Sequence, residues 1–222
     1  MARSAVLALA VGAVVSGCSP AFRDGVGPVV PVPNVEGSVM RSGSAASGLD
    51  VSLRDSSGME TAKTVTSASG SYGFGDVAPG GWEVKVSGSM PGDFDSVTRD
   101  FALASPSVTL TSVDVSARGA AASDPANGAS LPVPSAAQPL TFQWTFPSVA
   151  GATAHVQVFD SQGSPVWSSG SLKVGSSAWD GLGNQGTYQG KAAVPGSYTW
   201  RLKFSLPDSS QAKTAPWRLD LR

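Results

Sequence analysis

The chain has few of the side chains that catalytic and metal sites use. Its 222 residues include one cysteine, Cys18, and one histidine, His155. A structural zinc site needs four ligands, mostly Cys and His, so this chain cannot supply one. A serine-type triad would need the histidine beside a nucleophile and a carboxylate, and the chain has no G-x-S-x-G elbow. We therefore predict no catalytic residue, no metal and no cofactor.

Charged residues and long apolar runs are also scarce. Asp, Glu, Lys and Arg make up 14% of the residues, and the formal net charge is −1. Proteins that bind nucleic acid carry a basic footprint that this composition does not supply, so no nucleic-acid partner is expected. The apolar run 5–15 is shorter than the roughly 20 residues of a membrane-spanning helix. Hydrophobic residues still reach 41%, which is enough to build folded cores.

The first 18 residues have the organisation of an export signal. A basic start with Arg3 precedes the apolar run 5–15, and the small residues Ser16 and Gly17 lead directly into Cys18. A run of this length is typical of a signal-peptide core. The stretch resembles the bacterial lipobox, which implies that Cys18 becomes the mature N-terminus and carries acyl chains such as palmitate. The alternative from the residues alone is an ordinary secretory peptide with an unpaired cysteine.

The lipobox resemblance implies a bacterial lipoprotein of the cell envelope. Residues 1–17 would be its lipoprotein signal peptide and residues 18–33 its lipidated tether. Ser19, rather than Asp, follows the cysteine. In the Gram-negative sorting scheme this implies the outer membrane, with the protein facing the periplasm or the cell surface. Prolines and glycines in the tether favour an extended spacer between the membrane and the folded part.

After residue 33 the sequence changes to short runs in which apolar and polar residues alternate. The runs are bounded by Gly, Pro, Ser or Asp, and none has the 3.6-residue period of a helix. This pattern is typical of an antiparallel β-sandwich, which we expect over residues 34–118. Between two runs, residues 55–58 (DSSG) predict a hairpin turn in which Gly58 adopts a positive φ. The apolar positions of the runs are Val35 and Val39, Val51 and Leu53, Tyr72 and Phe74, Trp82, Val84 and Val86, Phe101 and Leu103, and Val113 and Val115.

Four motifs in this segment occur in a set order. They are 37–39 (GSV), 48–53 (GLDVSL), 69–74 (SGSYGF) and 77–84 (VAPGGWEV). In this order they resemble the carboxypeptidase regulatory-like domain, a transthyretin-type β-sandwich. Some relatives carry a Lys–Asn isopeptide bond between their first and last strands. Because no lysine lies in the first strand of this segment, that crosslink is not expected.

A second set of alternating runs follows a small, polar stretch at 119–123, and we expect a second sandwich over residues 119–222. Its clearest runs contain Phe142 and Trp144 early and Tyr198 and Trp200 late. Two motifs, 178–181 (AWDG) and 194–200 (VPGSYTW), resemble the immunoglobulin or fibronectin type III fold, and more narrowly the Ig-like module of flagellar hook-capping proteins. In such a sandwich Tyr198 can form a tyrosine corner, with its hydroxyl bonded to the backbone upstream.

The remaining candidates for chemistry are oxygen ligands and aromatic side chains. Asp93 with Asp95, or Asp180 with Asn184, could offer oxygens to calcium, but calcium needs six to eight of them and neither loop has a third acidic partner. Alternation places Trp82, Trp144 and Trp200 in the cores.

Trp167 and Trp217 are the candidate contacts for a partner or a glycan. Trp167 follows Val166, so alternation requires one of the two to point outward, and Trp217 follows a proline near the end of the chain. Exposed Trp is favoured at sugar-stacking and protein interfaces.

The sequence therefore predicts an all-β protein of two tandem antiparallel β-sandwich domains after a lipoprotein signal peptide and a proline-rich tether. The leading functional hypothesis is a non-catalytic, lipid-anchored envelope protein. It would bind another envelope protein as an assembly module of an envelope, secretion, adhesion or surface-appendage complex. The alternative is a carbohydrate-binding module that recognises cell-wall or surface polysaccharide. A hydrolase that uses paired carboxylates is the third class, and no pair stands out by its spacing.

Overall fold

The computed structural model describes residues 34–182 and 191–222, and within these residues it contains strands and turns but no helix. It therefore has no helix, in the part described, that could cross a membrane. The predicted all-β class is confirmed. The predicted signal peptide 1–17, the predicted tether 18–33 with Cys18, and Asn184 lie outside the described residues.

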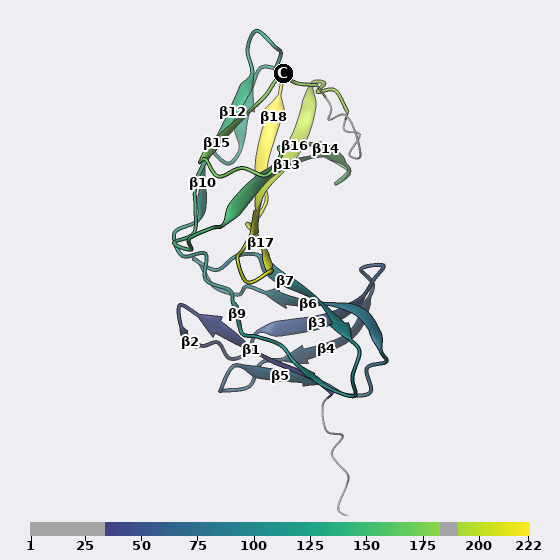
Figure 1. Ribbon diagram of the computed structural model, residues 1–222. Helices are drawn as coiled ribbons and strands as arrows, with labels where there is room; N and C mark the ends of the chain where they lie inside the picture. The colour runs from purple at the N-terminus through teal and green to yellow at the C-terminus, as the bar shows by residue number, and fades with distance from the viewer. Residues whose placement is uncertain (1–33, 183–190) are drawn as a thin grey trace, which may run out of the picture. The chain divides into compact units, whose positions relative to one another are not determined.

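The first sandwich contains nine strands (Figure 1). The predicted apolar positions Val35, Val51, Leu53, Val84 and Val86 are buried. The strands are β1 (Val35–Arg41), β2 (Ser44–Ala45), β3 (Asp50–Asp55), β4 (Glu60–Val65), β5 (Ser71–Phe74), β6 (Gly80–Ser87), β7 (Ser96–Leu103), β8 (Val108–Thr109) and β9 (Val113–Asp114).

The second sandwich also contains nine strands among the described residues. In β16 the expected alternation is complete, since Tyr198, Trp200, Leu202 and Phe204 are all buried. The strands are β10 (Ala121–Asp124), β11 (Ala129–Leu131), β12 (Leu140–Thr145), β13 (Thr153–Asp160), β14 (Pro165–Ser168), β15 (Ser176–Trp179), β16 (Gly196–Ser205), β17 (Gln211–Lys213) and β18 (Trp217–Leu221).

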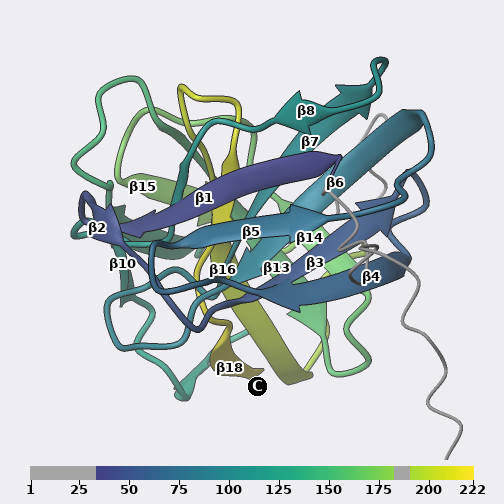
Figure 2. The same cartoon turned by 90° about the horizontal axis from the view of Figure 1, so that it is seen from below.

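Three sheets organise these strands. In one sheet β1 lies between β2 and β5 and also pairs with β8 and β9 (Figure 2). A small sheet has the order β10-β12-β15, and the largest has the path β11-β18-β16-β17-β7-β6-β3-β4, with β13 paired to β16 and to β14. Most pairs are antiparallel as expected. The pairs β1–β8, β1–β9 and β11–β18 are parallel, which the short strands after long loops did not reveal in the sequence.

Local side-chain chemistry forms the predicted turns. Gly58 has φ +83°, and the Asp55 carboxylate accepts hydrogen bonds from the backbone N–H groups of Ser57 and Met59. The hydroxyl of Tyr198 donates to the carbonyl of Val194 at 2.9 Å and accepts from its N–H at 3.1 Å. This is the expected tyrosine corner, and it holds the loop that precedes β16.

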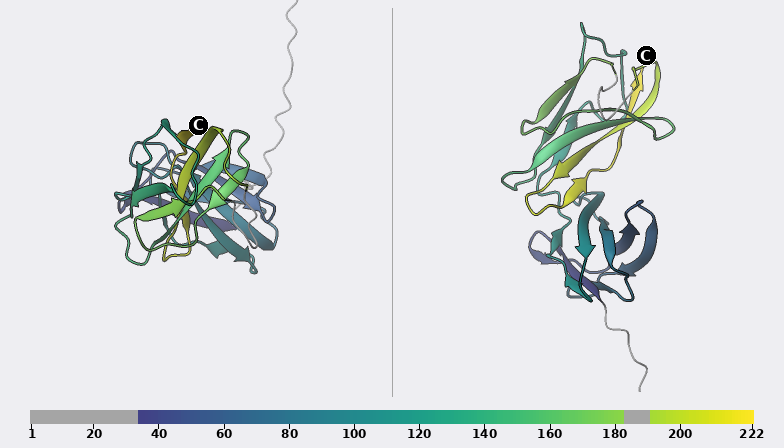
Figure 3. Two further views of the ribbon diagram at one scale, coloured as in Figure 1. Left: turned by 90° about the horizontal axis from the view of Figure 1, so that it is seen from above. Right: turned by 45° about the vertical axis from the view of Figure 1, so that its right-hand side comes forward.

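The largest sheet runs through both sandwiches because β17 pairs with β7 as well as with β16 (Figure 3). Residues 32–222 accordingly form one compact unit. Beside this pairing, the guanidinium of Arg99 in β7 donates to the carboxylate of Asp208 at 2.7 Å and to the carbonyl of Thr111 at 2.8 Å. The Arg99 side chain is only 6% exposed. A strand ladder and an ion pair with a buried guanidinium therefore join the two sandwiches.

Candidate functional site

Trp167, one of the two predicted contact residues, lies in a core, and the expectation that it or Val166 points outward is wrong. Their exposed fractions are 9% and 1%. The β13–β14 ladder shifts register here, since Val158 pairs with Trp167 and Phe159 pairs with Pro165. Val166 is the extra residue of this β-bulge, and a bulge breaks the alternation on which the prediction depended. Trp167 instead stacks on Phe142 and Trp179, with ring centroids 5.9 Å apart in both pairs.

Trp217, the other predicted contact, is half-buried on β18. Its ring packs edge-on against Trp200, with centroids 5.6 Å apart and planes at 74°. It therefore supports the core while part of its surface stays accessible. The structure does not bring Trp167 and Trp217 together as one exposed surface.

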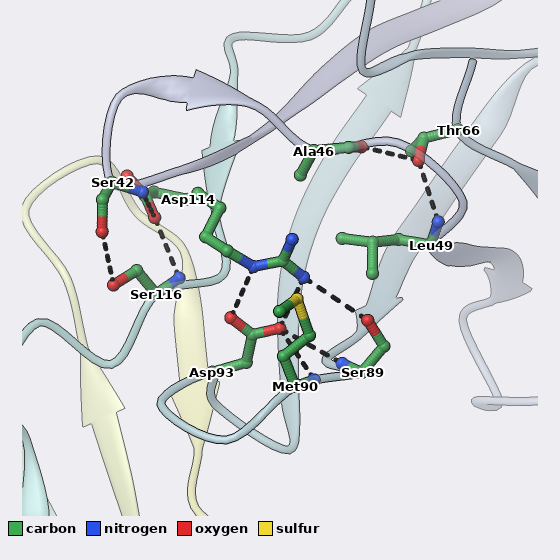
Figure 4. A network of polar contacts seen from close by, with 10 residues as sticks. Ser42, Ala46, Leu49, Thr66, Ser89, Met90, Asp93, Asp114 and Ser116 are labelled. Atoms are coloured by element: carbon green, nitrogen blue, oxygen red, sulfur yellow. Dashed lines mark hydrogen bonds and ion pairs between the residues drawn. The ribbon is translucent and has the colours of Figure 1, made fainter. Parts of the chain in front are cut away.

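The carboxylate of Asp93 is occupied by protein groups (Figure 4). Arg41 donates to both of its oxygens, at 2.8 and 2.7 Å, and the backbone N–H groups of Ser89 and Met90 donate at 3.2 and 3.3 Å. The hydrogen-bonded Arg41 guanidinium holds the pKa of Asp93 below its usual range. Asp93 thus fastens the 89–93 loop to the end of β1, and both of its carboxylate oxygens accept hydrogen bonds from protein groups.

The other sequence candidates also have local roles. The Asp180 carboxylate accepts from the backbone N–H of Leu182 at 3.0 Å. His155 lies half-buried on β13, with Nδ1 3.4 Å from the carbonyl oxygen of Ser169. In the residues that the structure describes, no three His, Cys, Asp or Glu side chains gather as metal ligands would.

A small apolar cavity of about 190 Å³ lies where the two sandwiches meet. Phe94, Pro147, Val149, Leu206 and Pro207 form its apolar wall. Ligand pockets usually enclose about 300 to 1,000 Å³, so this cavity is too small for a drug-sized ligand.

One open feature of the described residues is the free edge of β4. This strand ends the path of the largest sheet, so among the described strands it pairs only with β3. The N–H of Thr66 donates to the carbonyl of Leu49, and alternate residues of an antiparallel strand bond to the same neighbour. Lys63 and Val65 therefore direct their backbone N–H and C=O groups away from β3. Val65 is also 53% exposed, which is unusual for a valine.

The free edge of β5 lies near that of β4. The N–H of Ser67 donates to the carbonyl of Ser71 at 2.9 Å, and this bond closes the turn between the two strands. Beyond the turn β5 pairs with β1 through Gly37 and Tyr72. Gly73, one residue further along, turns its backbone groups to the open side. In Figure 2 β5 lies between β1 and β4.

A groove of about 590 Å³ follows β1, β5, β8 and the end of β4. Small residues, among them Gly37, Ser38, Ser71 and Gly73, line much of it. Because such side chains leave the backbone accessible, an extended chain could lie close to these strands. Sequence reasoning missed this site, since β4 (ETAKTV) has few of the apolar residues by which strands are found.

Comparison with known proteins supports the fold of the first sandwich. Residues 34–109 match the family model described as "BOS complex subunit NOMO1-like, second beta sandwich domain". No curated protein matches the chain.

Several solved structures resemble the chain weakly. BcpA, the major pilin subunit of Bacillus cereus, is 12% identical with a TM-score of 0.33, over 84% of this chain and 68% of that one. Fibronectin(III)-like modules of Clostridium thermocellum CbhA are 14% identical with a TM-score of 0.31, over 84% and 89%. The Bacillus anthracis TIE protein is 12% identical with a TM-score of 0.32, over 85% and 31%. At TM-scores this low the likenesses carry no argument about this chain.

Proposed function

We propose that this chain is a non-catalytic, lipid-anchored protein of the bacterial cell envelope that acts as a protein-binding module. Acyl chains on Cys18 would hold it in the outer membrane. Its partner would be another envelope protein in an envelope, secretion, adhesion or surface-appendage complex. The observation that carries the binding role is the open edge of β4 beside the groove along β5.

A partner could bind this edge by adding a strand. An extended segment gains main-chain hydrogen bonds to a free edge, while pockets for alternate side chains provide specificity. Among the described residues, Lys63 and Val65 present backbone groups that no neighbouring strand pairs, and the groove offers room beside them. The charged side chains of Glu60 and Lys63 on the same strand would discourage pairing between copies, as charged edge residues do in other sheet proteins.

The anchor can be tested separately from the binding site. In cells that process the lipobox, we expect wild-type protein in the membrane fraction and the Cys18→Ser variant in the soluble fraction. The reason is that several acyl chains on one residue hold a protein firmly. Retention of Cys18→Ser in the membrane fraction would show that something other than lipid on Cys18 holds the protein there.

Site-specific photocrosslinking tests the binding edge. A photoreactive amino acid at Lys63 should give a protein adduct of one defined mass in intact cells. The same amino acid at Val174, which is 59% exposed in the second sandwich, serves as the control and should not. Equal adducts at both positions, or none at Lys63, would contradict binding at this edge.

One observation favours carbohydrate binding as a second candidate function. Trp82 and Phe101 are half-buried cross-strand neighbours, and they line a groove of about 510 Å³ together with Asp55, Glu83 and Asp100. A partly exposed Trp beside carboxylates suits a sugar ring and its hydroxyls. Loss of retention on a polysaccharide column in Trp82→Ala, with an unchanged melting temperature, would support this function. Equal retention of the wild type and the variant would rule out carbohydrate binding through Trp82.

A further inference from the structure

Four basic side chains from both sandwiches share one face of the largest sheet. Lys203 of β16 is opposite Lys213 of β17, and Lys213 is opposite Ser96 of β7. Ser96 in turn is opposite Ser87 of β6. Directly opposed residues project to the same face, as do residues two apart on one strand, which adds Arg201 and Lys85. We call Lys85, Arg201, Lys203 and Lys213 the basic face.

None of these four cations is neutralised within the described residues. Six other basic side chains form ion pairs with carboxylates, but no carboxylate oxygen lies within 4.0 Å of the four. Arg201 donates to the side-chain amide of Gln157 at 3.1 Å and lies over the ring of Phe159. Both contacts position the guanidinium, and neither is an ion pair.

The arrangement carries an electrostatic cost. Like charges directly opposite each other on neighbouring strands destabilise a sheet, and Lys203 and Lys213 are such a pair. Burial lowers the pKa of Lys213, and the charges of Arg201 and Lys203 lower it further. Lys85, on the other side of β7, also lowers the pKa of Lys213, whereas Glu83 raises it. An anion bound here would relieve the repulsion.

The charges around the basic face indicate which anion fits. Glu83 and its cross-strand neighbour Asp100 lie at one border, and Asp95 acts electrostatically on Arg201. A uniformly anionic surface would meet these carboxylates as well as the cations, and juxtaposed like charges are costly. A chain with spaced carboxylates can pair with the cations and place uncharged residues against the acids.

We propose that the basic face binds an acidic segment of a partner protein, whose spaced Asp and Glu side chains pair with Lys85, Lys203 and Lys213. The proposal rests on the proposed protein-binding role and adds a chemistry for the partner. The basic face is distinct from the β4 edge, so the two surfaces can be tested independently.

The probe is a fluorescent synthetic peptide of alternating Glu and Ser residues, titrated with the full chain carrying Cys18→Ser. We expect the triple variant Lys85→Gln, Lys203→Gln, Lys213→Gln to bind at least about tenfold more weakly, since each partly exposed pair contributes on the order of threefold to fivefold. The matched control, Arg118→Gln, Lys173→Gln, Lys191→Gln, removes the same charge at exposed positions outside the basic face and the β4 edge. It should bind within about twofold of the parent chain. A melting curve for each variant verifies that it is folded.

Three results would overturn the proposal. The parent chain could fail to bind the peptide, or both triple variants could lose binding equally, which would mean that net charge alone is responsible. Alternatively, vesicles of phosphatidylglycerol and phosphatidylcholine could bind through the same three lysines while the peptide does not, which would assign the face to lipid. If crosslinking at Lys63 succeeds while peptide binding fails, the basic face is refuted and the proposed function stands.

The pH dependence of peptide binding distinguishes a direct role of Lys213 from a purely structural one. Because its pKa is lowered, Lys213 loses its proton at a lower pH than an ordinary lysine does. Peptide affinity should therefore fall as the pH rises from neutral toward the usual pKa range of lysine. The Lys213→Arg variant stays charged and should keep its affinity over this range. An equal fall in both proteins would contradict a direct role for Lys213.

Discussion

Arg99 and Asp208 form an ion pair of 2.7 Å although 109 residues separate them in the chain. Arg99 belongs to β7 of the first sandwich, and Asp208 to the turn before β17 of the second. The guanidinium is nearly buried, whereas the carboxylate side chain is 44% exposed. The pair lies beside the β7–β17 ladder and reinforces it.

Removing the charge of Asp208 should destabilise the whole described unit. Asp208→Asn keeps an oxygen for its bonds to Ser210 but leaves the buried Arg99 charge uncompensated. We expect a loss of about 2 kcal/mol in the free energy of unfolding, less than for a fully buried pair because Asp208 is half exposed. Urea denaturation measures it, with Lys63→Gln at an exposed pair as the control. Equal stability of Asp208→Asn and the wild type would mean that the pair does not join the sandwiches.

The close approach of Gly37 to Tyr72 should make Gly37 intolerant of any side chain. A Cβ at Gly37 would lie 2.3 Å from the Tyr72 hydroxyl oxygen. Since the Tyr72 ring is buried, Gly37→Ala should cost about 2 kcal/mol or more. Gly81→Ala meets no atom within 4 Å and should change stability by less than about 0.5 kcal/mol. Similar melting temperatures for the two variants would contradict the contact.

The Tyr72 hydroxyl predicts a substitution that stabilises the fold. The Tyr72 oxygen is buried without a hydrogen-bond partner among the described residues, and burial raises the pKa of Tyr72 to about 12. Tyr72→Phe removes an unsatisfied polar group, so we expect about 1 kcal/mol of added stability. Thermal unfolding at neutral pH measures this effect. A destabilised Phe variant would show that the hydroxyl has a partner.

The buried position of Trp167 predicts a structural role for this residue. Truncating an aromatic side chain in a core costs about 3 to 5 kcal/mol, so Trp167→Ala should destabilise the protein by about 4 kcal/mol. Trp217→Ala, at a half-buried site, should cost less. Chemical denaturation of both variants tests whether Trp167→Ala loses more stability than Trp217→Ala. Unchanged stability of Trp167→Ala would instead suit an exposed residue that contacts a partner or a glycan.

Acidification should remove the contribution of Asp93. Its pKa in the folded protein lies below its unfolded value of about 3.9, so its stabilisation is present above that pH and is lost as the pH falls through the folded pKa. The difference in unfolding free energy between wild type and Asp93→Asn should therefore be constant near neutral pH and shrink below about pH 4. Asp50→Asn, at an exposed pair, should show little difference throughout. If the difference in unfolding free energy between wild type and Asp93→Asn stayed constant down to about pH 2.5, the stabilising role of the Asp93 carboxylate would be contradicted.

Local signals in the sequence predict much of the fold. Alternation places Trp200 and Phe204 in a core, and a short motif places the Tyr198 corner, because each depends on residues close in the chain. The β-bulge at Val166 depends on how β14 pairs, which alternation within one strand does not show. For this reason alternation predicts that Val166 or Trp167 points outward, whereas both are buried.

Long-range pairing explains the features that the sequence did not reveal. β17 has three residues, with Ala212 as its one apolar side chain, and its partner β7 lies far back in the chain. The largest sheet, which this pairing completes, has β4 at one end and carries the basic face. Lys85 and Lys213 lie on one face only because of the register of β7, the strand between them. The net charge of −1 therefore does not reveal this local basic surface.

Partner capture in intact cells tests the central claim most directly. The full-length protein and its Val65→Pro variant would be crosslinked, purified by affinity, and analysed for what is recovered with them. Proline at Val65 removes an edge N–H that faces away from β3, so the fold should tolerate it, and Val65→Thr keeps that N–H as the control. We predict a near-stoichiometric protein partner with the wild type and Val65→Thr that is lost with Val65→Pro. Recovery of only glycan, or of the same partner with all three proteins, would contradict binding through the β4 edge.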